Sequence, residues 1–246
     1  MEKSPYLKSC DIVYIVKDTE YNGELRHSLR SVCQNFPHRN IWFIGGKPKR
    51  IYPDYYQPVP QSNTKFNNAD KLFNAIAENK YISNNFILFN DDFFVLKPIK
   101  KLPVYIDGTL AELIERVKVK NGIMYSDYTK LLKKTIEDLT KLNLPCNSFA
   151  LHIPMMINKK KMRDVIGVFG RFNRSLYGNY VYKENECVKI NDVKIISNIQ
   201  IPKPDQTFVS TRDGSFNIGE VGKYIRKKFN QPCEYEAYEQ YKNNSL

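Results

Sequence analysis

The sequence predicts an α/β fold with a mostly parallel sheet and helices packed on its faces. Short apolar runs of strand type alternate with longer segments whose apolar residues recur at helical spacing. As far as residue 90 the order is strand, helix, strand, loop, helix, strand, which is typical of parallel sheets. Hydrophobic residues make up 42% of the 246 residues, enough for one large domain with a real core.

Each element of this alternation has a local signal. The expected strands are rich in β-branched and aromatic residues, and Gly45 and Gly46 end the second of them. The expected helices carry one apolar face, as in Leu25, Leu29 and Val32. We therefore predict strands at 11–18, 40–46 and 86–90, and helices at 23–36 and 65–80.

Beyond residue 92 the pattern becomes mainly helical. Two amphipathic segments rich in Lys and Glu, 109–119 and 128–143, predict a helical insertion or lid near 107–145 within a single domain over 1–246. Further along, we expect a helix that Asn158 opens, a hairpin around Asn191 and Asp192, and a short late helix. Their expected ranges are 158–170, 187–196 and 219–229.

The chain is strongly basic, with a formal net charge of +12. Much of the excess lies in runs of two or three lysines, such as 159–161. A positive surface favours a polyanionic partner: nucleic acid, a teichoic-acid-like polymer, an anionic membrane surface or a nucleotide donor. A solvated basic face is the simpler interpretation of any single run.

Location and thiol chemistry can also be predicted. No apolar stretch reaches the roughly 18 to 20 residues that a membrane-spanning helix needs, and the amino terminus lacks the apolar segment of a signal peptide. We therefore expect no transmembrane segment and a cytoplasmic protein. The five cysteines include no CxxC pair, so small buried thiols are expected rather than a disulfide framework or a zinc site.

The segment FILFNDDFFVL, 86–96, places Asp91 and Asp92 between two apolar runs. In open parallel sheets, ligands bind at the carboxyl ends of the strands, which is where this pair would lie. Two close carboxylates repel each other unless a cation intervenes, and Mg²⁺ or Mn²⁺ prefers oxygen ligands that it shares with a phosphate. The pair therefore indicates metal-assisted handling of a diphosphate. The alternative is that one aspartate only caps the following turn.

Three segments considered together are more specific than the acidic pair. GELRHSLRSV, IWFIGG and FILFNDDFF resemble the Stealth family of sugar-phosphate transferases. SFALHIPMMINKKKM and RSLYGN are similar to segments of short bacterial and phage proteins related to that family. The resemblance covers roughly residues 10–100 and, more loosely, 145–180. Lys17 interrupts the acidic triplet of the family's opening block, so transfer of a sugar and of a sugar phosphate both stay open.

The resemblance implies a GT-A-like (Rossmann-like) fold, as in nucleotide-sugar transferases. It implies that Asp91 and Asp92 bind Mn²⁺ or Mg²⁺, or that one binds the metal while the other, Asp92, faces the sugar as a catalytic residue. His152 would be a third metal ligand or the base for the acceptor hydroxyl. A nucleotide sugar, with UDP as the expected nucleotide, would be the donor.

Seven further side chains are candidates for holding the donor. One pair lies four residues apart on a helix and could clamp a diphosphate, or form surface ion pairs instead. Three residues begin the helix before the acidic pair, where anions and bases bind readily. Two more follow a glycine in GRFNRSLYGN and could contact the donor phosphate or an anionic acceptor. The candidates are Arg26 and Arg30; Asn68, Asp70 and Lys71; Arg171 and Arg174.

The function that we expect is metal-dependent transfer of a sugar from a nucleotide sugar to a hydroxyl of a polyanionic acceptor. Charge favours modified bases in phage DNA as that acceptor, with a wall or capsular glycan as the other choice. One alternative is Stealth-type transfer of hexose 1-phosphate to a wall or capsular glycan. Another is a non-catalytic nucleic-acid-binding protein. A Mg²⁺ nuclease or phosphatase would need further carboxylates, for which Asp11, Asp18 and Asp107 are the candidates.

Overall fold

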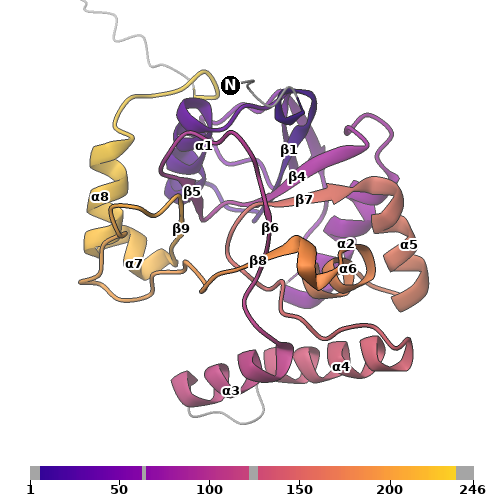
Figure 1. The fold of residues 1–246 in the computed structure, drawn as a ribbon. Helices are drawn as coiled ribbons and strands as arrows, with labels where there is room; N and C mark the ends of the chain where they lie inside the picture. Colours follow the sequence, from indigo (N-terminus) through magenta and orange to yellow (C-terminus); the bar gives the residue numbers. More distant parts are fainter. Residues whose placement is uncertain (1–5, 63–64, 122–126, 237–246) are drawn as a thin grey trace, which may run out of the picture.

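A five-stranded sheet forms the centre of the computed structural model, which describes residues 6–62, 65–121 and 127–236 (Figure 1). Its strand order is β3-β2-β1-β4-β7. The first four strands are parallel and β7 is antiparallel to β4, so the predicted mostly parallel sheet is confirmed. The strands are β1 (Asp11–Val16), β2 (Ile41–Gly45), β3 (Tyr55–Pro58), β4 (Asn85–Asn90) and β7 (Met155–Asn158).

Two hydrophobic cores lie on the two faces of this sheet because neighbouring residues of a strand point to opposite sides. Ile12 and Tyr14 of β1 pack on one side with helix α1 (Gly23–Asn35). Val13 packs on the other side with the helices α2 (Lys65–Glu78), α5 (Lys159–Phe169) and α6 (Arg174–Val181). Since both faces are covered, β1, β2 and β4 are almost wholly apolar.

The order of the strands creates a switch point between β1 and β4. From β1 the chain moves outward through β2 to β3, and it then returns to place β4 on the other side of β1. Ile15 of β1 pairs with Asn90 of β4, so the carboxyl ends of the two strands are level with each other. Ligands of open α/β sheets bind at such a point, outside the carboxyl ends of the strands.

A second layer of short elements lies beside the sheet. β5 (Phe93–Val95) pairs with β9 (Phe208–Ser210), and β6 (Val104–Ile106) pairs in parallel with β8 (Cys187–Lys189). The helices α7 and α8 flank β9 on the left of Figure 1. The remaining elements are η1 (Leu7–Ser9), η2 (Glu184–Glu186), α7 (Asp213–Asn217) and α8 (Glu220–Lys228).

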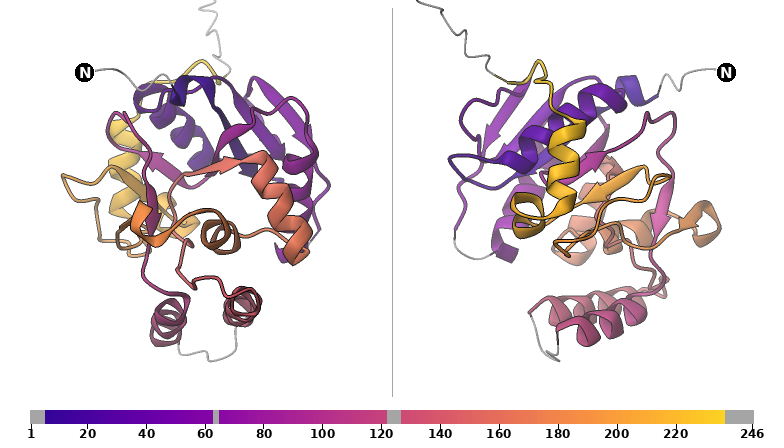
Figure 2. Two further views of the ribbon diagram at one scale, coloured as in Figure 1. Left: turned by 45° about the vertical axis from the view of Figure 1, so that its right-hand side comes forward. Right: turned by 90° about the vertical axis from the view of Figure 1, so that its left-hand side faces the viewer.

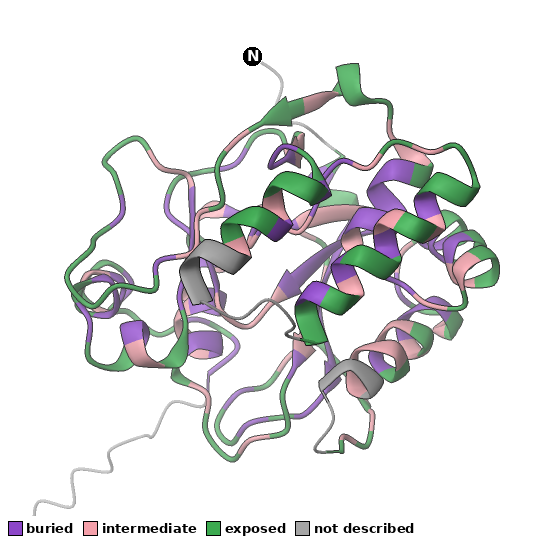
Figure 3. Ribbon diagram, turned by 90° about the horizontal axis from the view of Figure 1, so that it is seen from below, coloured by how far each residue is buried: buried purple, intermediate pink, exposed green. Residues whose placement is uncertain are grey.

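Two helices in the middle of the chain project away from the sheet. α3 (Leu110–Asn121) and α4 (Asp127–Lys141) pack on each other and lie below the rest of the molecule in Figures 1 and 2. Both were predicted from their amphipathic pattern. Figure 3 shows the same pattern on the surface helices in general, with buried residues on one side and exposed residues on the other.

The predicted hairpin around Asn191 and Asp192 is wrong. β8 ends at Lys189 and pairs with β6, and the backbone at Lys194 bridges to Ser210 instead of turning back on β8. A local turn signal was outweighed by two long-range pairings. The residues between the second strand and α2, expected to be a loop, also contain β3.

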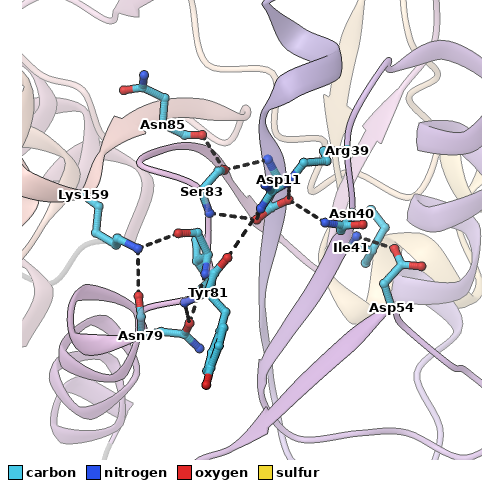
Figure 4. A network of polar contacts seen from close by, with 11 residues as sticks. Asp11, Arg39, Asn40, Ile41, Asp54, Asn79, Tyr81, Ser83, Asn85 and Lys159 are labelled. Carbon is cyan, nitrogen blue, oxygen red and sulfur yellow. Dashed lines mark hydrogen bonds and ion pairs between the residues drawn. The ribbon is translucent and has the colours of Figure 1, made fainter.

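A buried polar network links the amino-terminal ends of the central strands (Figure 4). Asp11 has a fully buried side chain that accepts hydrogen bonds from Arg39 Nε and Nη2, both at 2.7 Å, and from the Ser83 N–H at 2.8 Å. Lys159 donates to the carbonyl oxygens of Asn79 and Ile82. Asp11 begins β1 and Asp91 follows β4, and the two strands are parallel. The network therefore lies at the opposite end of the strands from the acidic pair.

The described helices can also be compared with the dimensions of a bilayer. None of the helices in the described ranges is both long enough and apolar enough to cross a membrane.

Candidate functional site

A cleft of about 800 Å³ opens at the carboxyl ends of β1 and β4. It therefore lies at the switch point of the sheet, and its volume is in the range of pockets that hold small ligands. Its wall consists of the residues after β1, the end of β4, the first turns of α2 and the loop before that helix. The lining residues are Ile15, Val16, Lys17, Asp18, Gln61, Ser62, Asn68, Ala69, Leu72, Phe73, Asn90 and Asp91.

Hydrogen bonds hold Gln61 and Asn68 in the wall of this cleft. Gln61 Nε2 donates to the carbonyl oxygen of Val16 at 2.8 Å, and Asn68 Oδ1 accepts from the Ser62 N–H at 2.7 Å. Gly45 has φ of 114°, and a Cβ at this position would come within 2.4 Å of the Val16 oxygen. Only glycine fits there without strain, so the cleft is largely preformed.

The side chains of Asp91 and Asp92 form hydrogen bonds with different partners. Asp91 lines the cleft, and its Oδ2 accepts a hydrogen bond from Asn22 Nδ2 at 2.7 Å. Asp92 Oδ2 accepts from Lys194 Nζ at 2.9 Å and from Ser210 Oγ at 3.0 Å. Its other oxygen, Oδ1, is buried and has no hydrogen-bond partner among the described residues. The pair thus joins the cleft to a second, partly buried polar region.

A third carboxyl group, Glu24, lies close to the pair. It begins α1, is 9% exposed, and accepts a hydrogen bond from Thr211 Oγ1. Burial raises the pKa of Glu24 to about 8, and the charges of Asp92 and Asp91 act in the same direction. Burial, followed by the charge of Asp92, also raises the pKa of Asp91 to about 6. Asp213 adds to both shifts, through a side-chain hydrogen bond with Glu24 and through its charge at Asp91, although burial is the larger cause.

We expect Glu24→Gln to stabilise the metal-free protein at alkaline pH. The pKa of Glu24 is about 8 in the folded chain against an ordinary value of 4.5, so the folded state binds this proton more tightly. The wild type therefore loses stability as the pH rises through this window, whereas glutamine has no proton to lose. Thermal melts should show the variant on the order of 5 °C above wild type near pH 9 and close to it near pH 5. An equal difference at both pH values would contradict this assignment.

Arg174 is buried close enough to Asp92 for their charges to interact. Its Nη1 donates to the carbonyl oxygens of Leu151, at 3.1 Å, and Ile153, while its buried Nη2 has no hydrogen-bond partner within the described ranges. Burial lowers the pKa of Arg174 to about 10, and the charges of Asp92 and Asp192 oppose that shift. The guanidinium is thus a fixed positive charge near the acidic pair.

His152 forms a dyad with Asp192. His152 Nδ1 lies 2.7 Å from Asp192 Oδ2, and the His152 N–H donates to Oδ1 at 2.9 Å. Burial disfavours ionisation of Asp192, but the contacts with His152 outweigh it, and the pKa of Asp192 is lowered. The His152 ring and the Arg174 guanidinium both contact the ring of Phe93, with 6.5 Å and 5.1 Å to its centre. The structure therefore brings the predicted His152 and Arg174 to the same neighbourhood as Asp92.

Arg26 and Arg30 do not line the cleft. Arg30 Nε and Nη2 bind the Glu236 carboxylate at 2.6 and 2.7 Å, and Arg30 Nη1 donates to the Phe229 carbonyl oxygen at 3.0 Å. Arg26 Nε lies 3.4 Å from the same carboxylate. The pair thus forms the ion pairs that were the alternative to a diphosphate clamp, and it holds the segment after α8 against α1.

The other donor-binding candidates are divided between two places. Asn68 lines the cleft. Asp70 and Arg171 line a separate pocket of about 390 Å³, where Arg171 Nη1 lies 2.6 Å from Asp138 Oδ2. Burial raises the pKa of Asp70, and the charge of Arg171 opposes the shift. Lys71 is exposed and lines neither pocket.

The predicted three-residue metal site is not assembled. In the part of the chain that the structure describes, no three His, Cys, Asp or Glu side chains are grouped closely enough to hold a metal ion. His152 is instead paired with Asp192. The carboxylates of Asp91 and Asp92, with the unpartnered Asp92 Oδ1, fit the other common arrangement, in which Mg²⁺ or Mn²⁺ takes one or two carboxylates together with substrate phosphates.

Sequence reasoning missed several residues of this region. Glu24 lies inside GELRHSLRSV, one of the three segments on which the resemblance rests, and this place in the sequence could have identified it as a site residue. Asp192 was interpreted as a turn residue. Lys194 and Ser210 had no signal, because they reach Asp92 from positions 102 and 118 residues away. Of the additional carboxylates considered for a nuclease, Asp18 lines the cleft.

No protein-family model matches the sequence, and a search of curated proteins found no significant match. The class of protein is therefore defined by its fold and by the geometry of its candidate site. The chain is an α/β protein with a mostly parallel sheet between layers of helices, compatible with a Rossmann-like fold. Its switch point carries a cleft and a pair of carboxylates.

Proposed function

We propose that the protein is a metal-dependent glycosyltransferase of GT-A type. In this proposal it moves a sugar from a nucleotide-sugar donor to a hydroxyl of a polyanionic acceptor. The observation that carries the proposal is the cleft at the switch point, with Asp91 on its wall and Asp92 as the next residue of the chain. A nucleoside binds in the cleft, and its diphosphate reaches the carboxylates.

The composition of the cleft supports binding of a nucleoside. Ile15, Leu72 and Phe73 supply apolar contact area for a base, while Asn68 and Gln61 supply donors and acceptors. Pockets for cofactors and nucleotides commonly combine an apolar wall with a few fixed polar groups. Gln61 is held by its bond to Val16, so its position is set before the ligand arrives.

Asp91 and Asp92 are the residues that would hold Mn²⁺ or Mg²⁺. Such an ion neutralises the diphosphate that leaves when the sugar is transferred. Arg174 adds a fixed positive charge beside Asp92, and its free Nη2 donor suits a phosphate or sugar oxygen. The acceptor hydroxyl loses its proton to His152, whose ring Asp192 orients through Nδ1.

The basic charge supports a polyanionic acceptor. The net charge of +12 favours either DNA with modified bases or an anionic wall or capsular glycan. Transfer of hexose 1-phosphate is a second candidate, because Arg174 could equally hold the phosphate that is transferred. The products separate the two reactions: sugar transfer releases a nucleoside diphosphate, and sugar-phosphate transfer releases a nucleoside monophosphate.

A thermal-shift panel tests the proposal. UDP-, GDP-, CDP- and dTDP-sugars are each added with Mn²⁺ and again with EDTA. We expect one donor to raise the melting temperature by a few degrees in Mn²⁺ and not in EDTA, since a ligand that binds only the folded state stabilises it. No shift with any donor, together with tight and salt-sensitive DNA binding, would instead support a non-catalytic nucleic-acid-binding protein.

A further inference from the structure

We propose that Lys194 is a built-in counter-cation of Asp92 that a divalent metal ion has to displace. The inference rests on the proposed function in one respect, namely that Asp91 and Asp92 are the metal ligands. It adds a residue that was not among the predicted site residues. It also implies that metal and donor bind cooperatively, because the donor diphosphate offers the displaced ammonium group a new partner.

The contact is specific and well supported. Lys194 Nζ lies 2.9 Å from Asp92 Oδ2, and the two side chains are only 22% and 13% exposed. The backbone beside Lys194 is fixed to β9, because the Ile195 N–H donates to the Ser210 carbonyl oxygen at 2.8 Å. Ser210 Oγ binds the same carboxylate oxygen at 3.0 Å. The ammonium is therefore delivered to Asp92 by the fold.

The charges around Asp92 explain why a cation is needed there. Glu24 and Asp91 are both close enough for the charge of Asp92 to raise their pKa values. Asp213 raises both pKa values as well, and Glu24, with a pKa of about 8, is largely protonated at neutral pH. The carboxylates that stay ionised at this partly buried place repel one another unless a positive charge lies among them. In the metal-free protein, Lys194 supplies that charge in direct contact, and Arg174 supplies it from nearby.

The contact also leaves one buried oxygen of the carboxylate without a partner in the described ranges. Lys194 and Ser210 both occupy Oδ2, whereas Oδ1 has no hydrogen-bond partner among the described residues. A divalent ion held by Asp92 would repel the ammonium, because the two positive charges would share one carboxylate. The lysine side chain is flexible and partly exposed, so it can move away. The Lys194 ammonium therefore weakens metal binding until it leaves Asp92 and binds the diphosphate of the donor.

Titration with MnCl₂ alone, followed by the electron paramagnetic resonance of free Mn²⁺, tests the inference. We expect Lys194→Met to bind Mn²⁺ about tenfold more tightly than wild type, the size of one like-charge contact. Lys194→Arg keeps the charge and should bind as wild type does. Lys203→Met removes an exposed lysine of the segment before β9 and serves as the matched control. Adding UDP should tighten Mn²⁺ binding more in wild type than in Lys194→Met.

Equal or weaker Mn²⁺ binding by Lys194→Met would overturn the inference, provided that its melting curve shows a folded protein. Lys194→Arg covers the case in which the methionine variant does not fold, since a tighter affinity in this charge-retaining variant would overturn it equally. If wild type binds Mn²⁺ in the presence of UDP and Lys194→Met shows no gain, only the inference fails. If neither protein binds Mn²⁺ with or without UDP, the metal site of the proposed function fails as well.

Discussion

Asp92→Asn is expected to lower sugar transfer, or slow donor hydrolysis, by at least about 100-fold. Asparagine keeps the shape of the side chain and can still accept from Ser210, but it removes the negative charge that would hold the metal. Folding should change little, because the lost attraction to Lys194 is offset by less repulsion from Asp91. The measurement is steady-state release of nucleoside diphosphate, with thermal melting of the same samples.

Asp205→Asn is the matched control, since it removes one exposed carboxylate from the segment that precedes β9. It should retain the activity of the wild type. If Asp92→Asn released nucleotide at the wild-type rate, Asp92 would be a structural partner of Lys194 and Ser210 only, and the proposed chemistry would have to be abandoned.

Asp11→Ala should have the opposite signature, a large loss of stability without loss of chemistry. The substitution removes the carboxylate that accepts two bonds from Arg39 and one from the Ser83 N–H. Breaking a buried charged network of this kind costs about 3–5 kcal/mol, which corresponds to roughly 10 °C in melting temperature. Below its own melting temperature the variant should release nucleotide at the wild-type rate per folded molecule.

Arg39→Ala provides the comparison for this second prediction. The Arg39 side chain is 44% exposed, so water can replace part of what is lost, and the variant should be less destabilised than Asp11→Ala. Chemical denaturation curves of the wild type, Asp11→Ala and Arg39→Ala give the order of their free energies of unfolding. A smaller loss for Asp11→Ala than for Arg39→Ala would show that the network at the amino-terminal ends of the strands does not depend on its buried carboxylate.

The elements that were predicted correctly are those whose signal is local. β1, β2 and β4 are continuous apolar runs, and α1, α4 and α5 show a helical period, so each can be found without knowing its neighbours. β5, β6, β8 and β9 are three residues each and depend on partners far along the chain. Such short segments carry no periodicity of their own, and this is also why the hairpin at Asn191 was predicted wrongly.

The candidate site likewise has one part that the local sequence predicts and another part that it does not. The position of Asp91 and Asp92 at a strand end follows from the local sequence and from the general rule for parallel sheets. What each carboxylate contacts does not follow from the local sequence, because Asn22, Lys194 and Ser210 come from three distant segments of the chain. Arg26 and Arg30 show the converse: their helical spacing was correct, but Glu236 at the far end of the chain determines what they bind.

The central claim is that a nucleotide occupies the cleft between the ends of β1 and β4. Photo-cross-linking with an azido-substituted nucleoside diphosphate, in Mn²⁺ and in EDTA, tests it most directly, with the attachment point read by peptide mass spectrometry. We expect Mn²⁺-dependent labelling of peptides that contain residues 15–18, 61–73 or 90–91, and we expect Asp91→Asn to suppress it. Labelling elsewhere, or labelling indifferent to metal and to Asp91, would contradict it.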